Sequence, residues 1–309
     1  MCTALHFGNF FGRTLDLECS HGEEVVVMPR GYKLSFIHEG TKVTKYSVVG
    51  TAHMAGGVPL FYDAINSAGV GVAALNFPGF AVYYDRCDEK INLASFEVIS
   101  YILGECGSLS EARELLLRTN ITNDSFSSKL KTTPLHWIVA DKEGSIVCEA
   151  VSGGIRIYEN FVGVMTNAPS FDFNLTRLAD FMHLSSSVPE NRIVPRAEIK
   201  PYSRGMGAMG LPGDFSSVSR FVRATFVKEN IIAREGEELE SFFHIMDTVS
   251  VPLGCATSES GEPVSTVYTS CADLERGEYY FTTYKSRKIR KITLSECGMC
   301  GLLRHPMET

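Results

Sequence analysis

Several features that would define a function are scarce in this chain of 309 residues. Its longest apolar runs, such as residues 70–75, have the length of a strand, far below the roughly 18 to 20 residues that cross a bilayer. Lysine and arginine form no basic cluster, and the net charge is −7. The first residues lack the basic and apolar regions of a signal peptide. We therefore expect neither a membrane nor a nucleic acid as a partner.

The cysteines do not form a disulfide framework. There are nine, an odd number, and they are scattered along the chain, which favours a reducing cytoplasm. Cys297 and Cys300 make one C-x-x-C pair, but a zinc site usually needs four ligands and no second pair accompanies it. We expect free thiols there and no metal site.

Cys2 is the residue with the clearest chemical potential. A small second residue allows removal of Met1, which leaves cysteine as the N-terminus of the mature chain. Such a residue carries a thiol nucleophile and an α-amine that titrates near neutral pH. The amine is then able to act as the base that activates the thiol. Many proteins begin with Met-Cys by chance, so the rest of the chain decides this interpretation.

Hydrophobic patterning predicts strands in both halves of the chain, separated by two sets of helices. Gly8 and Asn9 indicate a hairpin turn between the first two strands, and Ser108 with Glu111 forms a capping box at a helix start. The expected strands cover residues 2–7, 10–15, 24–28, 46–50, 69–75, 135–140, 145–151, 155–159, 162–166, 265–269, 278–284 and 289–293, and the expected helices cover 95–105, the segment after 108, 217–234 and 237–249.

This order lacks the regular alternation of strand and helix that a doubly wound parallel sheet requires, so it predicts an α+β layered fold. No linker or repeat divides the chain, and we expect one domain over residues 1–309. Gly205, Gly207 and Gly210 spell the dinucleotide motif G-x-G-x-x-G. That motif works only between a strand and a helix, and here Leu-Pro-Gly-Asp follows it. A surface or assembly loop is the better interpretation.

Some polar residues at predicted strand ends are candidates for the groups that an N-terminal cysteine needs. The hairpin would return Arg13 and Asp16 alongside Cys2, although residues three apart in a strand face opposite sides and a surface salt bridge is an alternative. Asn76 and Asn167 each end a strand, where asparagine also commonly forms turns.

Arg220 lies near the start of a predicted helix, where the partial positive charge of the helix disfavours a cation. It therefore hints at an anionic partner, with a solvated surface arginine as the alternative.

Taken together, the motifs resemble the choloylglycine hydrolase family of N-terminal-nucleophile hydrolases, which contains bile salt hydrolases and penicillin V acylases. The similarity spans nearly the whole chain in ordered blocks. These are Met-Cys-Thr at the start, Gly-Arg-Thr-Leu-Asp at 12–16, Leu-Asn-Phe-Pro-Gly at 75–79, Leu-His-Trp at 135–137, Thr-Asn-Ala-Pro-Ser-Phe-Asp at 166–172, and Gly-Leu-Pro-Gly-Asp at 210–214 running into Ser-Arg-Phe at 219–221.

The resemblance implies a four-layer αββα sandwich, with two antiparallel sheets between helix layers, and hydrolysis of linear amide bonds without a metal or organic cofactor. It implies that Cys2 attacks the amide carbonyl and that its amine carries the proton. Asp16 would hold the amine and Arg13 the thiolate. The remaining implied roles are donation to the oxyanion by Asn76 and Asn167 and charge stabilisation by Arg220.

The chain departs from the family at its first hairpin. Only ten residues separate Cys2 from Arg13, where the family usually has a longer hairpin, and Thr14 stands where asparagine is common. The site geometry depends on whether the shorter turn keeps the strands in register.

The substrate expected from the resemblance is a bile acid conjugated to glycine or taurine, because Asn76 stands where similar penicillin acylases tend to have tyrosine. Apolar pocket walls are expected from four residues, with ordinary core packing as the alternative: Leu15, Phe126, Leu130 and Leu135. Other amide hydrolysis, such as penicillin V cleavage, and steroid binding without turnover are the competing hypotheses. The resemblance also implies a bacterial cytoplasmic homotetramer, with residues 189–213 as an assembly loop.

Overall fold

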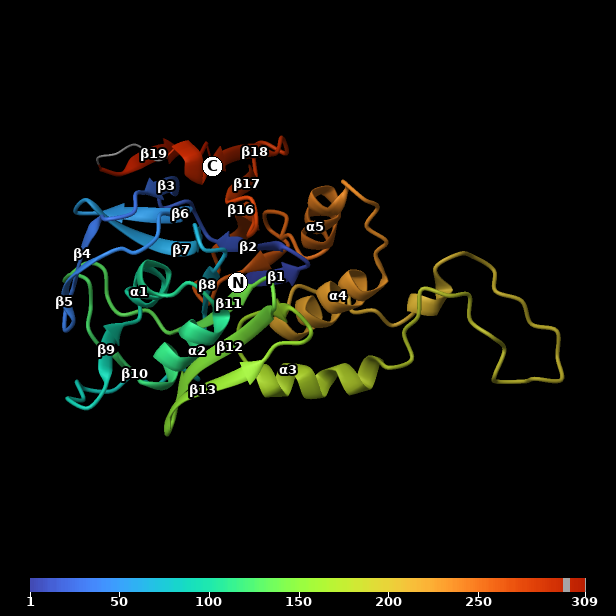
Figure 1. Ribbon diagram of the computed structural model, residues 1–309. Coiled ribbons are helices and arrows are strands. Elements are labelled where there is room, and N and C mark those ends of the chain that lie inside the picture. Colours follow the sequence, from blue (N-terminus) through green and yellow to red (C-terminus); the bar gives the residue numbers. More distant parts are fainter. Residues whose placement is uncertain (297–300, 309) are drawn as a thin grey trace.

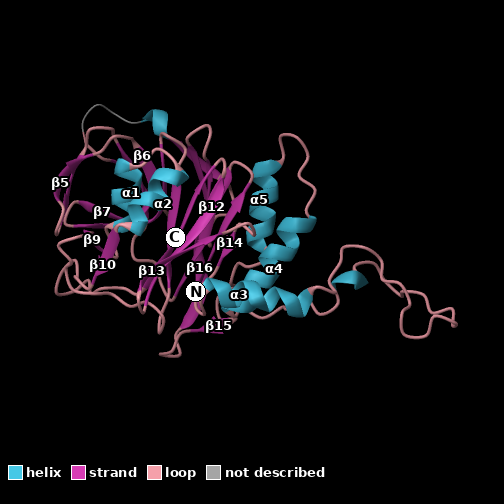
Figure 2. Cartoon of the chain, turned by 60° about the horizontal axis from the view of Figure 1, so that its bottom comes forward, coloured by secondary structure: helices cyan, strands magenta, loops and turns pink. Residues whose placement is uncertain are grey.

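The computed structural model describes residues 1–296 and 301–308. In this part of the chain, two large antiparallel sheets stack face to face, and helices cover their outer surfaces. Figure 2 shows the strands running between α1 and α2 on one side and α4 and α5 on the other. The expected αββα sandwich is confirmed. The C-x-x-C pair at 297 and 300 lies outside the described residues.

Sheet 1 carries the N-terminus and is built around the first hairpin. In spatial order its strands are β14 (Val164–Met165), β1 (Cys2–Phe7), β2 (Phe10–Leu17), β16 (Pro263–Asp273), β17 (Glu278–Thr283) and β18 (Arg290–Thr293), and β15 (Ala256–Thr257) pairs with β16. Phe7 pairs with Phe10, so Gly8 and Asn9 form the predicted two-residue turn. Gly8 has a φ of 60°, which suits glycine at the first central position of such a turn.

Sheet 2 forms the other half of the sandwich. Its spatial order is β13 (Gly154–Glu159), β12 (Gly144–Val151), β11 (Leu135–Asp141), β8 (Gly71–Asn76), β7 (Val58–Asn66), β6 (Val48–Ala55), β3 (Glu24–Met28) and β19 (Leu303–Pro306). Two small ribbons lie beside it: β4 (Lys33–Phe36) pairs with β5 (Gly40–Val43), and β9 (Ile91–Ala94) pairs in parallel with β10 (Thr119–Thr122).

The helices bury their apolar faces against the outer surfaces of the sheets. They are α1 (Val98–Glu105) and α2 (Leu109–Leu117) over sheet 2, α4 (Ser217–Asn230) and α5 (Glu238–Asp247) over sheet 1, and the shorter α3 (Phe171–Arg177). Ser108 accepts a hydrogen bond from Glu111 N, as the capping box predicts. At α4, the Ser216 hydroxyl accepts from Ser219 N. This cap fixes the start of the helix that carries Arg220.

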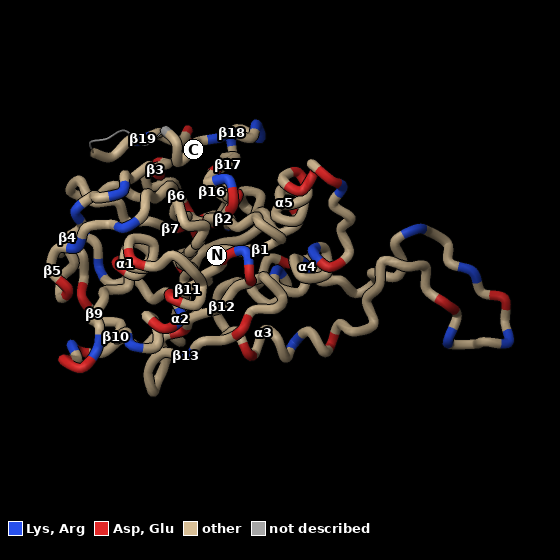
Figure 3. The backbone as a smooth tube through the Cα atoms, viewed as in Figure 1, with Lys and Arg blue, Asp and Glu red and all other residues tan. Residues whose placement is uncertain are grey.

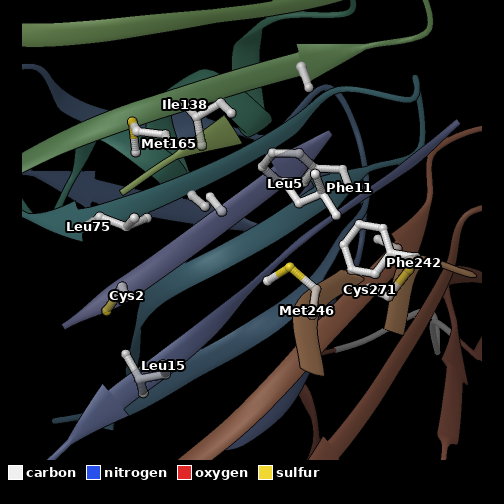
Figure 4. Packing of buried hydrophobic residues seen from close by; sticks show 14 of the residues in the cluster. Cys2, Leu5, Phe11, Leu15, Leu75, Ile138, Met165, Phe242, Met246 and Cys271 are labelled. Atoms are coloured by element: carbon white, nitrogen blue, oxygen red, sulfur yellow. The ribbon is translucent and has the colours of Figure 1, made fainter. Parts of the chain in front are cut away.

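The sheets approach closely because small residues face large ones across the interior. A Cβ atom on Gly71 of β8 would lie 2.6 Å from the ring of Phe11 on β2. Leu75 and Ile138 pack in the same buried cluster as Cys2 (Figure 4). Cys2 is thus anchored at one end of the inter-sheet core.

Sequence patterning located most strands but missed β7, in the middle of sheet 2. Asp63 interrupts its apolar pattern, yet the carboxylate is buried and accepts hydrogen bonds from the hydroxyls of Tyr268, Ser270 and Tyr279 on sheet 1. A charged residue in the middle of a central strand is tolerated because another element supplies its donors.

Other differences concern element ends and short elements. The predicted helices at 95–105, 217–234 and 237–249 are shorter in the structure, while the strand predicted at 265–269 extends to Pro263–Asp273. The strands β4, β5, β9, β10, β15 and β19 and the helix α3 were also not predicted. Of the G-x-G-x-x-G glycines, Gly207 lies in a short 3₁₀ helix, Met206–Ala208, and Gly205 and Gly210 lie in the turns on either side of it, so the motif is not between a strand and a helix.

Candidate active site

Cys2 is the first residue of β1, and its thiol points into the sandwich. Its side chain is buried, with an exposed fraction of 3%, and it pairs across the hairpin with Leu15. The main-chain nitrogen of Cys2 donates to Asn167 Oδ1 at 2.6 Å. Met1 precedes it, and the Met1 amine donates to the main-chain oxygen of Asp16 at 2.8 Å. The nitrogen proposed as a base is therefore already held by the site.

Arg13 lies on the same face of sheet 1 as the thiol, here called the thiol face. Ala4 pairs with Arg13, and side chains two apart in a strand share a face, so Arg13 and Cys2 point the same way. Arg13 Nη2 donates to Cys2 Sγ at 2.6 Å. The short hairpin therefore keeps the arginine within reach of the sulfur.

The guanidinium of Arg13 is buried and held rigidly. Nε donates to Thr14 O at 3.1 Å, and Nη1 donates to Tyr62 O at 3.2 Å and to Ala74 O. Burial alone would lower the pKa of Arg13, but the neighbouring Cys2, Tyr268 and Asp63 groups outweigh burial and raise the pKa. The side chain is thus a permanent cation beside the Cys2 thiol.

Asp16 faces the other side of sheet 1, the helix face, which points toward α4 and α5. Its Oδ1 accepts from Thr266 Oγ1 at 2.7 Å, and its Oδ2 accepts from Thr14 Oγ1 at 3.3 Å. Irregular pairing of β16 with β2 between Thr266 and Tyr268 marks a β-bulge at this point, and bulges re-aim side chains near active sites. Arg13 and Asp16 are both buried on opposite faces of the strand, so the surface salt bridge between them is ruled out.

Arg220 reaches the main chain of Cys2 from the helix face. It is fully buried, which rules out the solvated alternative. Its Nη1 donates to Cys2 O and to Thr3 Oγ1 at 2.6 Å, and its Nη2 donates to Asn167 Oδ1 at 2.8 Å. Burial lowers the pKa of Arg220, and the nearby Asp16 and Cys2 oppose that shift. The side chain ties the start of β1 to the Asn167 segment.

The two asparagines lie side by side, although they come from distant parts of the chain. Asn167 Nδ2 donates to the main-chain oxygen of Asn76 at 2.8 Å. Asn167 is buried, whereas the side chain of Asn76 is exposed at the end of β8. The structure thus brings the two candidate residues together, one buried and one exposed.

This arrangement has the parts of a nucleophilic site: a thiol beside a fixed cation, the main-chain nitrogen of the same residue beside a polar acceptor, and amide groups nearby. While Met1 is attached, the nitrogen of Cys2 is an amide and is unable to accept a proton. Removal of Met1 would convert it into an amine at the same position.

Comparison with known proteins identifies the family. The model of the linear amide C–N hydrolases, choloylglycine hydrolase family, matches residues 2–301. The chain belongs to this family. A bile salt hydrolase/transferase from Lactiplantibacillus plantarum is 41% identical over 96% of this chain and 93% of its own length. A conjugated bile acid hydrolase from Lactobacillus gasseri is 34% identical over 91% and 92%, respectively.

Solved structures agree with the assignment. A mutant conjugated bile acid hydrolase from Clostridium perfringens matches with a TM-score of 0.92 and 30% identity, covering 100% of this chain and 97% of that one. A penicillin V acylase from Agrobacterium tumefaciens has a TM-score of 0.76 at 22% identity over 98% and 90% of the two chains, which shows a shared fold. The predicted family, and with it a hydrolase of linear amide C–N bonds, is confirmed.

A mostly apolar cavity of about 190 Å³ lies beside the partners of Arg13. Tyr62 and Ala74, whose main-chain oxygens hold the guanidinium, both line it. Three of the predicted pocket residues are also part of its wall: Phe126, Leu130 and Leu135. A second cavity of about 140 Å³ shares Leu60, Phe96 and Phe126 with it. The cavity is therefore placed to hold an apolar group near the thiol.

Leu15 does not line either of these cavities. It lies in the buried inter-sheet cluster opposite Cys2 (Figure 4), and its contact with substrate stays a prediction. In the described residues no helix is long and apolar enough to span a membrane. No group of His, Cys, Asp and Glu within 1–296 and 301–308 has the arrangement of a metal site.

Several supporting residues were missed from the sequence. Thr266 holds Asp16, and the main-chain oxygens of Tyr62 and Ala74 hold Arg13. A main-chain acceptor carries no side-chain signature, and Thr266 is one of many threonines in strands. Asp63 was also missed, but the sequence held a signal for it. A lone carboxylate in an apolar stretch indicates a buried polar network.

Proposed function

We propose that this protein is a bile salt hydrolase, which cleaves the amide bond of glycine- and taurine-conjugated bile acids through a thioester on Cys2. The observation that carries the proposal is 41% identity, over nearly the full length of both chains, to a protein named bile salt hydrolase/transferase. Conjugated bile acid hydrolases are also among the other relatives and the matched structures.

The site supports this substrate class. A conjugated bile acid joins a broad apolar ring system to an anionic amino acid through one amide bond. The cavity lined by Phe126, Leu130 and Leu135 supplies apolar walls for the ring system. Because Arg13 contacts both the cavity wall and Cys2 Sγ, a ring system seated there would place its acyl chain beside the sulfur.

In acylation, the sulfur of Cys2 attacks the carbonyl carbon of the substrate. The thiol proton passes to the free α-amine of Cys2, which Asp16 and Asn167 orient, while Arg13 stabilises the thiolate. Asn167 and Asn76 donate to the oxygen that becomes negatively charged in the tetrahedral intermediate. The intermediate collapses when the C–N bond breaks and the α-amine gives its proton to the departing nitrogen. Glycine or taurine leaves, and a thioester remains.

In deacylation, water attacks the thioester carbonyl and gives one proton to the α-amine. The C–S bond then breaks, and the sulfur regains a proton from the amine as the free bile acid leaves. Arg220 compensates negative charge around Cys2 throughout both steps. Every proton is carried by groups of this chain, the substrate and water.

A three-substrate assay tests the proposal. Intact mass should first show that Met1 is absent from the purified protein. Incubation with glycocholate and taurocholate should release glycine and taurine, with much less phenoxyacetate from penicillin V. Cys2→Ala should abolish turnover and still fold, and Cys2→Ser should lose most of it. Rapid penicillin V cleavage without bile salt cleavage would replace the proposed substrate. Binding of bile salts without release of an amino acid would show a binding protein.

We also propose a homotetramer located in the bacterial cytoplasm and formed by one domain over residues 1–309. Residues 189–213 extend far from the sandwich (Figure 1), and Figure 3 shows charges of both signs along this segment. Ile193 and Tyr202 are almost fully exposed there, which suits burial against other subunits. Light scattering should give the mass of four chains, and Ile193→Asp with Tyr202→Asp should lower it. A monomeric wild type would contradict this assembly.

A further inference from the structure

His136 and Glu149 form a buried polar pair in the sandwich, outside the groups used above. They face each other on β11 and β12, and their exposed fractions are 1% and 0%. His136 Nδ1 lies 3.5 Å from Glu149 Oε1. Glu149 Oε2 has no hydrogen-bond partner in the described part of the chain. Such a pair is costly to bury, so its position calls for a reason.

Glu149 holds the segment that follows Asn167. Its Oε1 accepts a hydrogen bond from the main-chain nitrogen of Phe171 at 2.8 Å, and Phe171 is the first residue of α3. A buried carboxylate that accepts from a main-chain N–H makes a strong, directional contact. This contact fixes the chain four residues beyond Asn167.

His136 packs against the segment that carries Asn76. Its ring stacks on Phe77, with ring centroids 4.3 Å apart and planes 6° apart, and Phe77 directly follows Asn76. Burial lowers the pKa of His136, while Glu149 and the main chain of Thr166 act in the opposite direction. The imidazole thus packs against the chain next to Asn76, while its partner Glu149 holds the chain beyond Asn167.

We propose that His136 and Glu149 are positioning residues, which set the distance between the Asn76 and Asn167 segments and thereby the geometry of the oxyanion donors. This inference rests on the proposed function. The pair touches neither the thiol nor Arg13, so it acts on stabilisation of the tetrahedral intermediate and leaves the reactivity of the sulfur unchanged. It therefore governs kcat for amide cleavage and leaves simple alkylation of the thiol untouched.

Single substitutions of Glu149 test the contact with Phe171. Glu149→Gln keeps an oxygen acceptor for the Phe171 N–H, whereas Glu149→Met removes it. We expect Glu149→Met to lower kcat for glycocholate by roughly 10- to 100-fold with little change in KM, because misplacement by about 1 Å costs on the order of 100-fold. Glu149→Gln should recover most of kcat. Alkylation of Cys2 by iodoacetamide should proceed at the wild-type rate in both.

A double variant separates positioning from stability. His136→Phe combined with Glu149→Met removes both polar side chains and keeps the stacking on Phe77. It should fold even where Glu149→Met alone does not, because the single variant leaves both the His136 imidazole and the Phe171 N–H without Glu149, whereas the double variant leaves the Phe171 N–H alone. Its kcat should still be low. The matched control is Trp137→Phe, which alters the neighbouring position on the opposite face of β11 and should retain kcat at a similar or greater loss of stability.

The outcomes distinguish this inference from the proposed function. Wild-type protein is assayed first, and failure to cleave either conjugated bile salt refutes the proposed function. If the wild type is active and the folded double variant has a kcat within threefold of the wild-type value, the proposed role of the pair is refuted. A loss of kcat in Trp137→Phe equal to that in the double variant also refutes it, as does slower alkylation of Cys2 in parallel with kcat.

Discussion

Replacing Arg220 with methionine should damage both the stability and the activity of the enzyme. Arg220 is buried without contact to solvent and donates to Cys2 O, Thr3 Oγ1, Asn167 Oδ1 and Phe215 O. Methionine fills much of the same space but donates nothing. Asn167 Oδ1 keeps the N–H of Cys2 as a partner, whereas the other acceptors lose the guanidinium.

The size of the effect follows from these contacts. A buried acceptor left without a donor costs about 1–3 kcal/mol, and removal of one partner of a buried charge group costs about 3–5 kcal/mol. We expect Arg220→Met to lower the free energy of unfolding by about 3–5 kcal/mol, out of a total of about 5–15 kcal/mol. Loss of the anchor on Asn167 should lower kcat by roughly 100- to 1,000-fold, the usual effect of losing an oxyanion donor.

Urea unfolding followed by circular dichroism measures the stability, and glycine release from glycocholate measures kcat. Arg220→Lys keeps the charge but not the planar set of donors, so its loss on both scales should be smaller. Arg223→Met is the matched control, because Arg223 lies on the same helix and donates to the main-chain oxygens of Thr248, Pro212 and Asp214. It should lose stability and retain kcat.

The reasoning is refuted if the free energy of unfolding of Arg220→Met lies within about 1 kcal/mol of the wild-type value, since that is the cost of a single neutral hydrogen bond. A kcat within threefold of the wild type would equally refute it. So would an equal loss of kcat in Arg223→Met, because that variant leaves every contact to Cys2 and Asn167 in place.

Three further predictions concern the nucleophile, the pocket and acid stability. A variant that keeps an additional residue attached to the N-terminal side of Cys2 should have a turnover at least about 100-fold lower, because an amide nitrogen is unable to act as a general base. Wild-type turnover in a variant whose intact mass confirms the additional residue would contradict this. Phe126→Ala and Leu130→Ala should raise KM for glycocholate roughly tenfold, as expected for lost apolar burial, and an unchanged KM in both would exclude this cavity. Hydrogen bonds from Ser216 and Ser219 lower the pKa of Asp214 from 3.8 to about 2. A carboxylate with a lowered pKa stabilises the fold fully above about pH 4, and this stabilisation is lost as the pH falls toward 2. Asp214→Asn should therefore make the stability, measured by fluorescence-monitored unfolding, less dependent on pH in this range. An unchanged pH dependence would contradict the prediction.

Most of the fold was predictable because its strands and helices carry the usual local patterns. The Gly8–Asn9 turn and the alternation in β1 and β2 sufficed to place Arg13 and Asp16 alongside Cys2, and the pairing confirms this. Strand parity also required that Arg13 and Asp16 face opposite sides, as they do. By contrast, β7 was missed because the partners of Asp63 are hydroxyls on the other sheet.

What the sequence by itself determined is the family and the set of candidate site residues, because motifs and strand periodicity are local properties of the chain. Only the tertiary structure decided which groups meet. Asn167 reaches Asn76 and Cys2 across 91 and 165 residues of chain, respectively, and Arg220 reaches Cys2 O across 218. The same holds for His136 and Glu149, which sequence analysis did not single out for any role. Contacts between segments so far apart depend on the stacking of two sheets and the start of one helix, and no local pattern encodes that geometry.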